Sequence, residues 1–172
     1  MTRLAKWNHL DHRLFCYLHQ FIASKSLYWW ARICSITGDG FLYLASGLAC
    51  LWLGMHNAFK ILAVGFAIER SVYFLAKPIF RRNRPSVVIP NIKAAIKPAD
   101  QFSFPSGHSS GAFLFATIMQ QLGFGVTAFL WASCVAMSRV FLGVHFVTDV
   151  LAGALVGLGV GIGCSIVLGS TV

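Results

Sequence analysis

Long apolar stretches dominate the chain, and short polar segments separate them. Runs of this length with few charges are typical of helices buried in a bundle or crossing a membrane. The clearest stretches are residues 41–59 and 60–76, a third that starts within residues 105–108 and ends near 121, a fourth that follows the turn at 123–125 and runs to 138, and a fifth from 146 to about 168. Most are shorter than the roughly 20 residues that cross a bilayer core, so loop residues must extend them. The pattern predicts an all-α, multi-pass membrane bundle of about five transmembrane helices.

Turn residues mark the ends of these stretches. Residues 37–40 read Thr-Gly-Asp-Gly and predict a helix break, residues 56–57 predict a tight turn, and residues 123–125 predict another. Prolines recur through residues 77–104 and rule out a long helix there. Because the third and fourth stretches form a hairpin, the loops before and after it should lie on the same side of the membrane.

The N-terminal segment, residues 1–38, has a different pattern. Its apolar residues fall on one helical face, at steps of three and four: Leu10, Leu14, Leu18 and Phe21. This face predicts an amphipathic helix lying in the membrane interface. The alternative is a sixth span over residues 8–36, which Lys25 and Arg32 disfavour. Three histidines are expected at the surface, near lipid headgroups: His9, His12 and His19.

Two features inside the apolar stretches predict contacts between helices. Gly153, Gly157 and Gly161 recur every four residues, so the backbone of the last helix can approach a neighbouring helix closely. Glu69 in the second stretch either joins a basic site through Lys77, or pairs with Arg70 or with a partner on another helix.

Composition supports a membrane protein of one domain, residues 1–172. The chain is 57% hydrophobic and 11% charged, with a mean hydropathy of +0.71, which excludes an ordinary soluble globule. The net charge of +9 is concentrated in residues 1–32 and 77–97. This clustering indicates contacts with membrane lipids and phosphate, and it gives no face for nucleic acid.

The five cysteines are isolated along the chain and mostly lie inside apolar runs. They form neither a disulfide framework nor a C-x-x-C metal pair, so they are interpreted as small buried hydrophobic residues. No metal ion and no cofactor is expected.

Three polar islands interrupt the apolar pattern between residues 77 and 149. They are residues 77–85, 104–108 and 138–149. Ionisable residues are costly in lipid and usually lie at its boundary or in a polar cavity. Together the islands supply two histidines, one carboxylate and several cations, which is an inventory for holding a phosphate and attacking its phosphorus.

Each island has residues suited to phosphate. Lys77, Arg84 and Arg139 would supply charge and directed hydrogen bonds to the nonbridging oxygens. Ser106 and Gly107 open a helix, where backbone amides favour an anion. Ser106 is also a good helix N-cap, which is its purely structural role.

His145 and Asp149 lie four residues apart, on one helical face. The carboxylate can accept from one ring nitrogen of His145 and leave the other free to attack. Arg81 and Arg82 fall between motif positions and are expected to contact headgroups or water.

The spacings K-x6-R-P, P-S-G-H and S-R-x5-H-x3-D together resemble the type 2 phosphatidic acid phosphatase superfamily, the lipid phosphate phosphatases. The resemblance implies a metal-independent phosphatase in which His145 forms a phosphohistidine. It also implies that His108 is the general acid, and that the substrate is phosphatidic acid, phosphatidylglycerophosphate or a polyprenyl phosphate. Gly107 before His108 resembles the phosphatidylglycerophosphatase B type, whereas the small size resembles undecaprenyl diphosphate phosphatases.

Two other functions are compatible with the same residues. One is a vanadium haloperoxidase, although such enzymes are soluble. The other is a non-catalytic protein that binds lipid phosphates. The resemblance implies a bacterial inner membrane with the site facing outward, whereas the distribution of bases favours the cytoplasmic side. No pattern specifies an oligomeric state.

Overall fold

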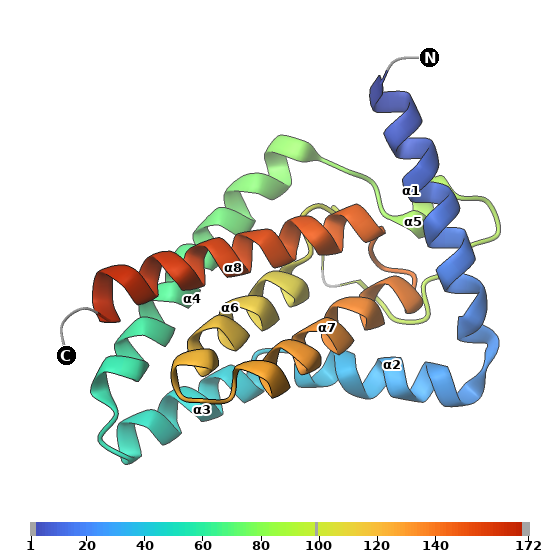
Figure 1. Cartoon of the computed structure of the whole chain (residues 1–172). Helices are drawn as coiled ribbons and strands as arrows, with labels where there is room; N and C mark the ends of the chain where they lie inside the picture. The colour runs from blue at the N-terminus through green and yellow to red at the C-terminus, as the bar shows by residue number, and fades with distance from the viewer. Residues whose placement is uncertain (1–2, 99, 170–172) are drawn as a thin grey trace.

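Helices make up the fold in the computed structural model, which describes residues 3–98 and 100–169. In chain order they are α1 (Arg3–His19), the 3-10 helix η1 (Gln20–Ala23), α2 (Lys25–Thr37), α3 (Phe41–Trp52), α4 (His56–Phe80), α5 (Pro85–Val88), α6 (Gly107–Gln121), α7 (Gly125–Phe141) and α8 (Val147–Gly169). Figure 1 shows α6, α7 and α8 running alongside one another, with α2 and α3 on one side and α4 on another. The helix α1 lies across one end of this bundle.

Local sequence explains where several helices begin and end. Gly40, with a φ of +99°, sits in the break between α2 and α3, and Gly123, with a φ of +85°, turns the chain between α6 and α7. Only glycine adopts such angles without strain. Ser106 caps α6, because its Oγ accepts from the amide of Ser109 at 3.4 Å. The breaks predicted at residues 37–40 and 123–125 are confirmed.

The turn between the first two apolar stretches was predicted at the wrong place. α3 ends at Trp52, and the chain turns at Gly54, whose φ is +73°. His56 is already the first residue of α4, which continues through Pro78 to Phe80. Glycine at the left-handed position decides the turn, whereas the polar residues 56 and 57 are compatible with a first helical turn. Because α4 extends this far, it carries Lys77 to the polar end of the bundle.

The helices α6 and α8 pack with unusually close backbones. A Cβ atom on Gly157 would lie 2.2 Å from the carbonyl oxygen of Ser110, and one on Gly153 would lie 2.4 Å from that of Ser106. A Cβ on Gly161 would meet the side chain of Thr117 at 2.7 Å. The predicted small-residue face of the last helix is confirmed, and it fixes α8 against the helix that begins in the P-S-G-H motif.

This contact predicts a localised stability effect. Gly157→Ala should lower the free energy of unfolding by about 1–3 kcal/mol, because the obstructing atom is backbone that cannot rotate away. Gly159 lies on the same helix, and a Cβ added there would have no atom of the described residues within 4 Å, so Gly159→Ala is the matched control. Thermal unfolding of both variants in detergent measures the difference. Equal melting temperatures for the two would contradict the close approach.

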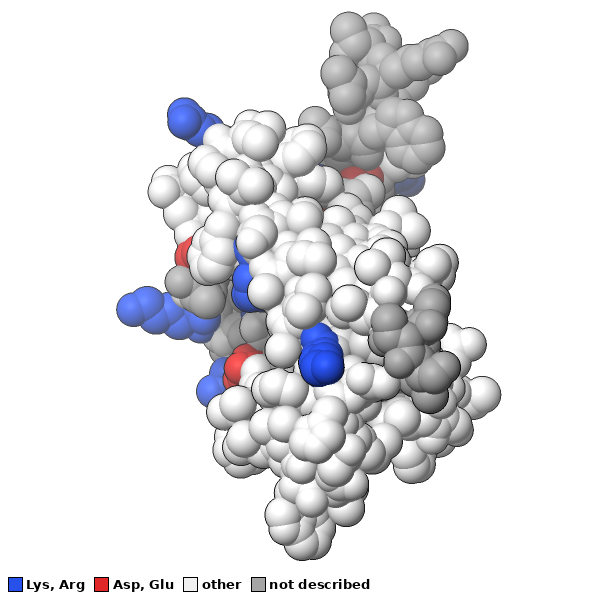
Figure 2. Space-filling model, turned by 90° about the vertical axis from the view of Figure 1, so that its left-hand side faces the viewer, with Lys and Arg blue, Asp and Glu red and all other residues white. Residues whose placement is uncertain are grey.

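The outer surface of the bundle is largely apolar. Trp52 is 86% exposed and Phe41 81% exposed, and Figure 2 shows a face with only scattered charged side chains. Within the described residues, 147–168 of α8 are long and apolar enough to cross a membrane alone. α2 and α3 are long and apolar enough only if the two helices, which are bent by 42° relative to one another, form a single span. Length and hydropathy therefore identify one or two spans among these residues and do not confirm the expected five.

The N-terminal helix is present, but its inward face differs from the expectation. Leu10, Leu14 and Phe21 are exposed, as a membrane-facing surface would be. The opposite face is buried, and His19 on it bonds through Nδ1 to the carbonyl oxygen of Phe141 at 2.8 Å. The prediction that His19 lies at the surface is therefore wrong, because α1 packs against the end of α7.

Candidate active site

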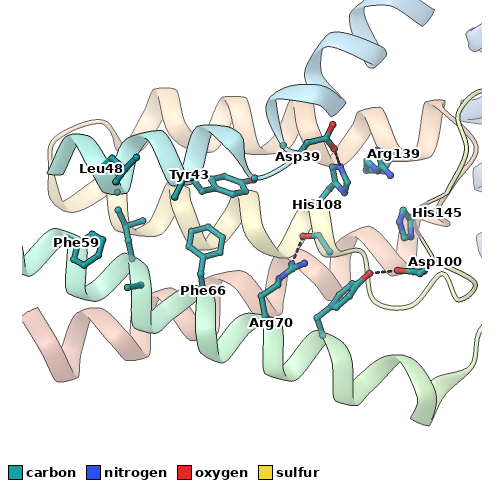
Figure 3. Close-up of a pocket in the computed structure, with 18 of the residues that line it drawn as sticks. Asp39, Tyr43, Leu48, Phe59, Phe66, Arg70, Asp100, His108, Arg139 and His145 are labelled. Carbon is teal, nitrogen blue, oxygen red and sulfur yellow. Dashed lines mark hydrogen bonds and ion pairs between the residues drawn. The ribbon is translucent and has the colours of Figure 1, made fainter. Parts of the chain in front are cut away.

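A cavity of about 600 Å³ opens between the α2–α3 turn, α4, α6 and the α7–α8 loop. Its two ends differ in chemistry (Figure 3). The polar end is lined by Asp39, Arg70, Arg84, Asp100, His108, Arg139 and His145. The other end is an apolar arm, lined by Tyr43, Leu44, Gly47, Leu48, Phe59, Leu62, Ala63 and Phe66. The structure thus brings both predicted histidines and two of the three predicted cations to one cavity, next to an apolar channel.

His108 enters the cavity from the first turn of α6. Its Nε2 lies 2.6 Å from Oδ1 of Asp39, in the turn between α2 and α3 (Figure 3). Sequence reasoning assigned residues 37–40 only to a helix break and missed this partner. An acidic residue between two turn glycines was the available signal.

His145 lies in the short loop before α8 and is 3% exposed. Its Nδ1 is 3.8 Å from Oδ2 of Asp149, which is within ion-pair reach but beyond hydrogen-bond length. Oδ2 instead accepts the amide of Phe146 at 2.8 Å. The predicted direct hydrogen bond from the His145 ring to Asp149 is therefore absent between these two described residues. The carboxylate lies beside the imidazole and acts on it through charge.

Arg82 holds Asp149 on its other side, and this corrects the expectation that Arg82 contacts headgroups. One guanidinium nitrogen donates to Oδ1 of Asp149 at 2.6 Å, and the other donates to Asp11 of α1 at 2.5 Å. Asp149 is fully buried and Asp11 is 5% exposed. Two buried carboxylates need a cation, and Arg82 is placed between them. No role was predicted for Asp11, and this carboxylate on the polar face of the N-terminal segment was the available sign that Arg82 has a buried partner.

Lys77 and Arg84 meet at a shared carboxylate, Asp100, in the proline-rich loop. Lys77 donates to Oδ1 at 2.7 Å, and Arg84 donates to the same oxygen at 2.6 Å. Burial raises the pKa of the Asp100 carboxyl, but the hydrogen bonds from Lys77 and Tyr73 outweigh burial and hold that pKa below its ordinary value. Asp100 therefore stays ionised and keeps both cations in place. Sequence reasoning did not single it out.

Arg84 also reaches His145. Its Nη1 donates to the carbonyl oxygen of Val144 at 2.7 Å and lies 3.5 Å from Nε2 of His145. Arg139, from the last turn of α7, donates to the hydroxyl of Ser35 on α2. Nε of Arg139 is buried and has no hydrogen-bond partner within the described residues. Both guanidinium groups line the cavity with donor capacity toward it.

The helix start at residues 106–107 contributes differently from the prediction. The amide of Ser106 donates to the carbonyl oxygen of Asp149 at 3.0 Å, and Ser106 does not line the cavity. The expectation that its amide faces an anion is wrong, because α8 takes that donor, and the capping role remains. Gly107 does line the cavity. A Cβ there would lie 2.7 Å from the ring of Tyr73, so only glycine fits.

Glu69 pairs with Arg70, the second of the two expected alternatives. Arg70 donates through Nε at 2.5 Å and through Nη2 at 2.7 Å to the buried carboxylate. Nη2 also donates to the carbonyl oxygen of Gly107 at 3.2 Å. The pair joins α4 to the first turn of α6. In the part of the chain that the structure describes, no group of three or more His, Cys, Asp or Glu side chains is placed to hold a metal ion.

A sequence profile of the PAP2 superfamily matches residues 58–170, which include every motif position of this site. The chain belongs to the PAP2 superfamily. This confirms the resemblance drawn from the three motifs. With the apolar outer surface and the span in α8, it identifies a membrane protein.

Named relatives and a solved structure agree with this membership. The chain is 32% identical over 114 residues to "Probable lipid phosphate phosphatase beta" of Arabidopsis thaliana, covering 49% of this chain and 53% of the relative. It is 30% identical over 126 residues to the decaprenylphosphoryl-5-phosphoribose phosphatase of Mycolicibacterium smegmatis, covering 72% of this chain and 69% of the relative. The chain therefore spans only about half the length of the plant relative.

The fold matches that of a transmembrane PAP2-type phosphatidylglycerolphosphate phosphatase from Bacillus subtilis. The TM-score is 0.82 at 24% identity, over 99% of this chain and 89% of the solved one. At this identity the match shows the shared fold.

Proposed function

We propose that the protein is a membrane phosphatase that removes phosphate from a lipid phosphate without a metal ion. The supporting observation is the cavity itself, which joins two histidines and three arginines to an apolar arm (Figure 3). A phosphate at the polar end would leave its lipid tail in the arm between α3 and α4. The apolar arm and the largely apolar outer surface favour this function over a haloperoxidase.

The reaction has two steps. Nε2 of His145 attacks phosphorus, the bond to the lipid oxygen breaks, and His108 gives its proton to the leaving alkoxide. His108 then takes a proton from water as the water oxygen attacks the phosphohistidine, which releases inorganic phosphate and restores His145. Asp149, 3.8 Å from Nδ1, stabilises the positive charge that the ring acquires in the intermediate.

Phosphoryl transfer depends mainly on positioning and on charge stabilisation. Arg84 and Arg139 would bind the nonbridging oxygens directly, because both line the cavity. Lys77 is buried and lies outside the lining, so it acts by holding Asp100 and through it Arg84. Gly107 would offer its amide at the start of α6.

The proposed substrate class includes phosphatidic acid, phosphatidylglycerophosphate and polyprenyl phosphates. The alternative substrate is undecaprenyl diphosphate. The alternative function is a non-catalytic protein that binds lipid phosphates. We further infer that the bundle crosses a bacterial inner membrane several times, with the polar end of the cavity at the outer face. The ion pair of buried Glu69 with partly exposed Arg70 at the polar end supports a boundary position for that end, since charges are costly deeper in lipid.

Blocking the apolar arm tests the proposal. Gly47 lines the arm, and its nearest neighbour across the space is the ring of Phe59, at 3.7 Å from an added Cβ. Gly47→Phe should lower the ratio of kcat/KM for a long-chain lipid phosphate to that for p-nitrophenyl phosphate at least about tenfold, because lost apolar contact costs more than about 1.4 kcal/mol.

Phosphate release from detergent micelles gives both values. Gly163→Phe is the control, since Gly163 on α8 has open space around it among the described residues and lies outside the cavity. An unchanged ratio would contradict the tail assignment. No turnover of any lipid phosphate by the wild-type protein would favour the non-catalytic alternative.

A further inference from the structure

The partner of His108 comes from a segment outside the matched PAP2 residues. Asp39 lies in the turn between α2 and α3, before residue 58, where the family match begins. Its Oδ1 is 2.6 Å from Nε2 of His108, across a separation of 69 residues. Asp39 and His108 therefore form a second carboxylate–imidazole pair, and both of its members line the cavity, whereas only His145 of the His145–Asp149 pair does.

The turn that carries Asp39 is pressed onto the bundle. A Cβ on Gly38 would lie 2.7 Å from the side chain of Val135 on α7 and 3.3 Å from the ring of His108. Just before it, Nε1 of Trp131 donates to the hydroxyl of Thr37 at 2.9 Å. Packing and this hydrogen bond fix the position of the turn relative to α6 and α7. Asp39 is therefore held at His108 by more than its own hydrogen bond.

The charges around His108 are unbalanced without Asp39. The guanidinium groups of Arg139 on α7 and Arg70 on α4 both face the imidazole and disfavour a proton on it. Asp39 is the carboxylate that faces it among the residues the structure describes. Its side chain is 55% exposed, so water screens its charge. The hydrogen bond between Nε2 and Asp39 therefore contributes more to holding the imidazole than the Coulomb attraction between the two groups does.

We propose that Asp39 is a positioning residue for general acid catalysis, holding the His108 imidazole by Nε2 so that Nδ1 faces the leaving oxygen. This inference rests on the proposed phosphatase function. In the first step the proton leaves Nδ1 for the lipid alkoxide as the phosphorus–oxygen bond breaks. In the second step Nδ1 takes the proton of the attacking water. Asp39 keeps its own protonation state throughout and fixes which nitrogen takes part.

Leaving-group dependence tests this role. Asp39→Asn keeps the size of the side chain but loses the carboxylate, so it should lower kcat/KM for a lipid phosphate about 10- to 100-fold. The loss on p-nitrophenyl phosphate should be several times smaller, because that leaving group needs little protonation. The alkaline limb of the pH profile should move to lower pH by up to about one unit, since the protonated imidazole loses its anionic acceptor. Asp39→Glu should recover part of the lipid activity.

Two variants make the result decisive. Thr37→Val removes the bond to Trp131 but keeps Asp39 and the packing of Gly38 that holds the turn in place, so it should change both activities by the same small factor and leave the pH profile in place. His108→Ala reports whether an acid at His108 is used at all. If His108→Ala shows the leaving-group dependence and Asp39→Asn does not, the Asp39 inference is overturned while the phosphatase proposal stands. If the wild-type protein hydrolyses no lipid phosphate, the phosphatase proposal itself fails.

Discussion

Replacing His145 by alanine should lower kcat/KM for a lipid phosphate by at least about 10⁴-fold, because the variant would lose the nucleophile proposed to form the covalent intermediate. His145 is 3% exposed, and its Nε2 lies 3.5 Å from Nη1 of Arg84, which lines the cavity beside it. An attacking nitrogen next to a phosphate-binding cation has the arrangement that in-line transfer needs. Removing the ring leaves the cations and the cavity in place, so substrate can still bind.

Trapping the intermediate measures this directly. Wild-type protein quenched during turnover of a ³²P-labelled lipid phosphate should carry an acid-labile, base-stable label, and the His145→Ala variant should carry none. His9→Ala is the control, since His9 is exposed on α1 and outside the cavity. It should match the wild-type protein in rate and in label. Appreciable turnover or labelling of purified His145→Ala protein would rule out the assignment.

The sequence alone placed most of the site because its motifs flank a helical hairpin. α6 begins at Gly107 and α7 ends at Phe141, so two antiparallel helices bring His108 and Arg139 to one end of the bundle. The continuation of α4 to Phe80 brings the first motif to that end. These placements follow from local signals: a capping serine, turn glycines and apolar stretches of known length.

The missed residues depend on contacts between distant segments. Arg82 meets Asp11 across 71 residues, and Asp39 meets His108 across 69. The local pattern predicted only a headgroup contact for Arg82, an amphipathic helix around Asp11 and a turn around Asp39. Their second role exists only because α1 and α2 pack against the end of α7, and no periodicity in either segment specifies that packing.

Asp149 shows what the spacing of two residues can and cannot predict. Its spacing from His145 correctly predicted that the two lie together, but not the hydrogen bonds of the carboxylate. The Phe146 amide and Arg82 take its two oxygens in this structure, so its distance to the imidazole is 3.8 Å. Spacing on a helix fixes which side chains are neighbours. Competing donors from elsewhere decide which of them form hydrogen bonds.

Vanadate should inhibit the enzyme competitively, and Arg139→Lys should weaken that inhibition about 100-fold. Vanadate adopts the five-coordinate geometry of the transferring phosphoryl group, so its apical bond is expected at Nε2 of His145. Arg139 lines the cavity, donates to Ser35, and keeps Nε without a partner among the described residues. A planar guanidinium can hold Ser35 and two vanadate oxygens together. A lysine ammonium keeps the charge but not this fixed set of donors.

The same assay addresses the metal-free mechanism. If Arg84 and Arg139 supply the positive charge that a divalent ion supplies in other phosphatases, with Lys77 acting through Asp100, turnover and vanadate inhibition should both survive EDTA. Arg81→Lys is the matched control for Arg139→Lys, since the side chain of Arg81 bonds to the carbonyl oxygen of Pro78 and lies outside the cavity. Its inhibition constant should equal that of the wild-type protein. Activity lost in EDTA and restored by magnesium or zinc would refute the metal-free mechanism, because the arginines would then be binding a phosphate that a metal ion activates.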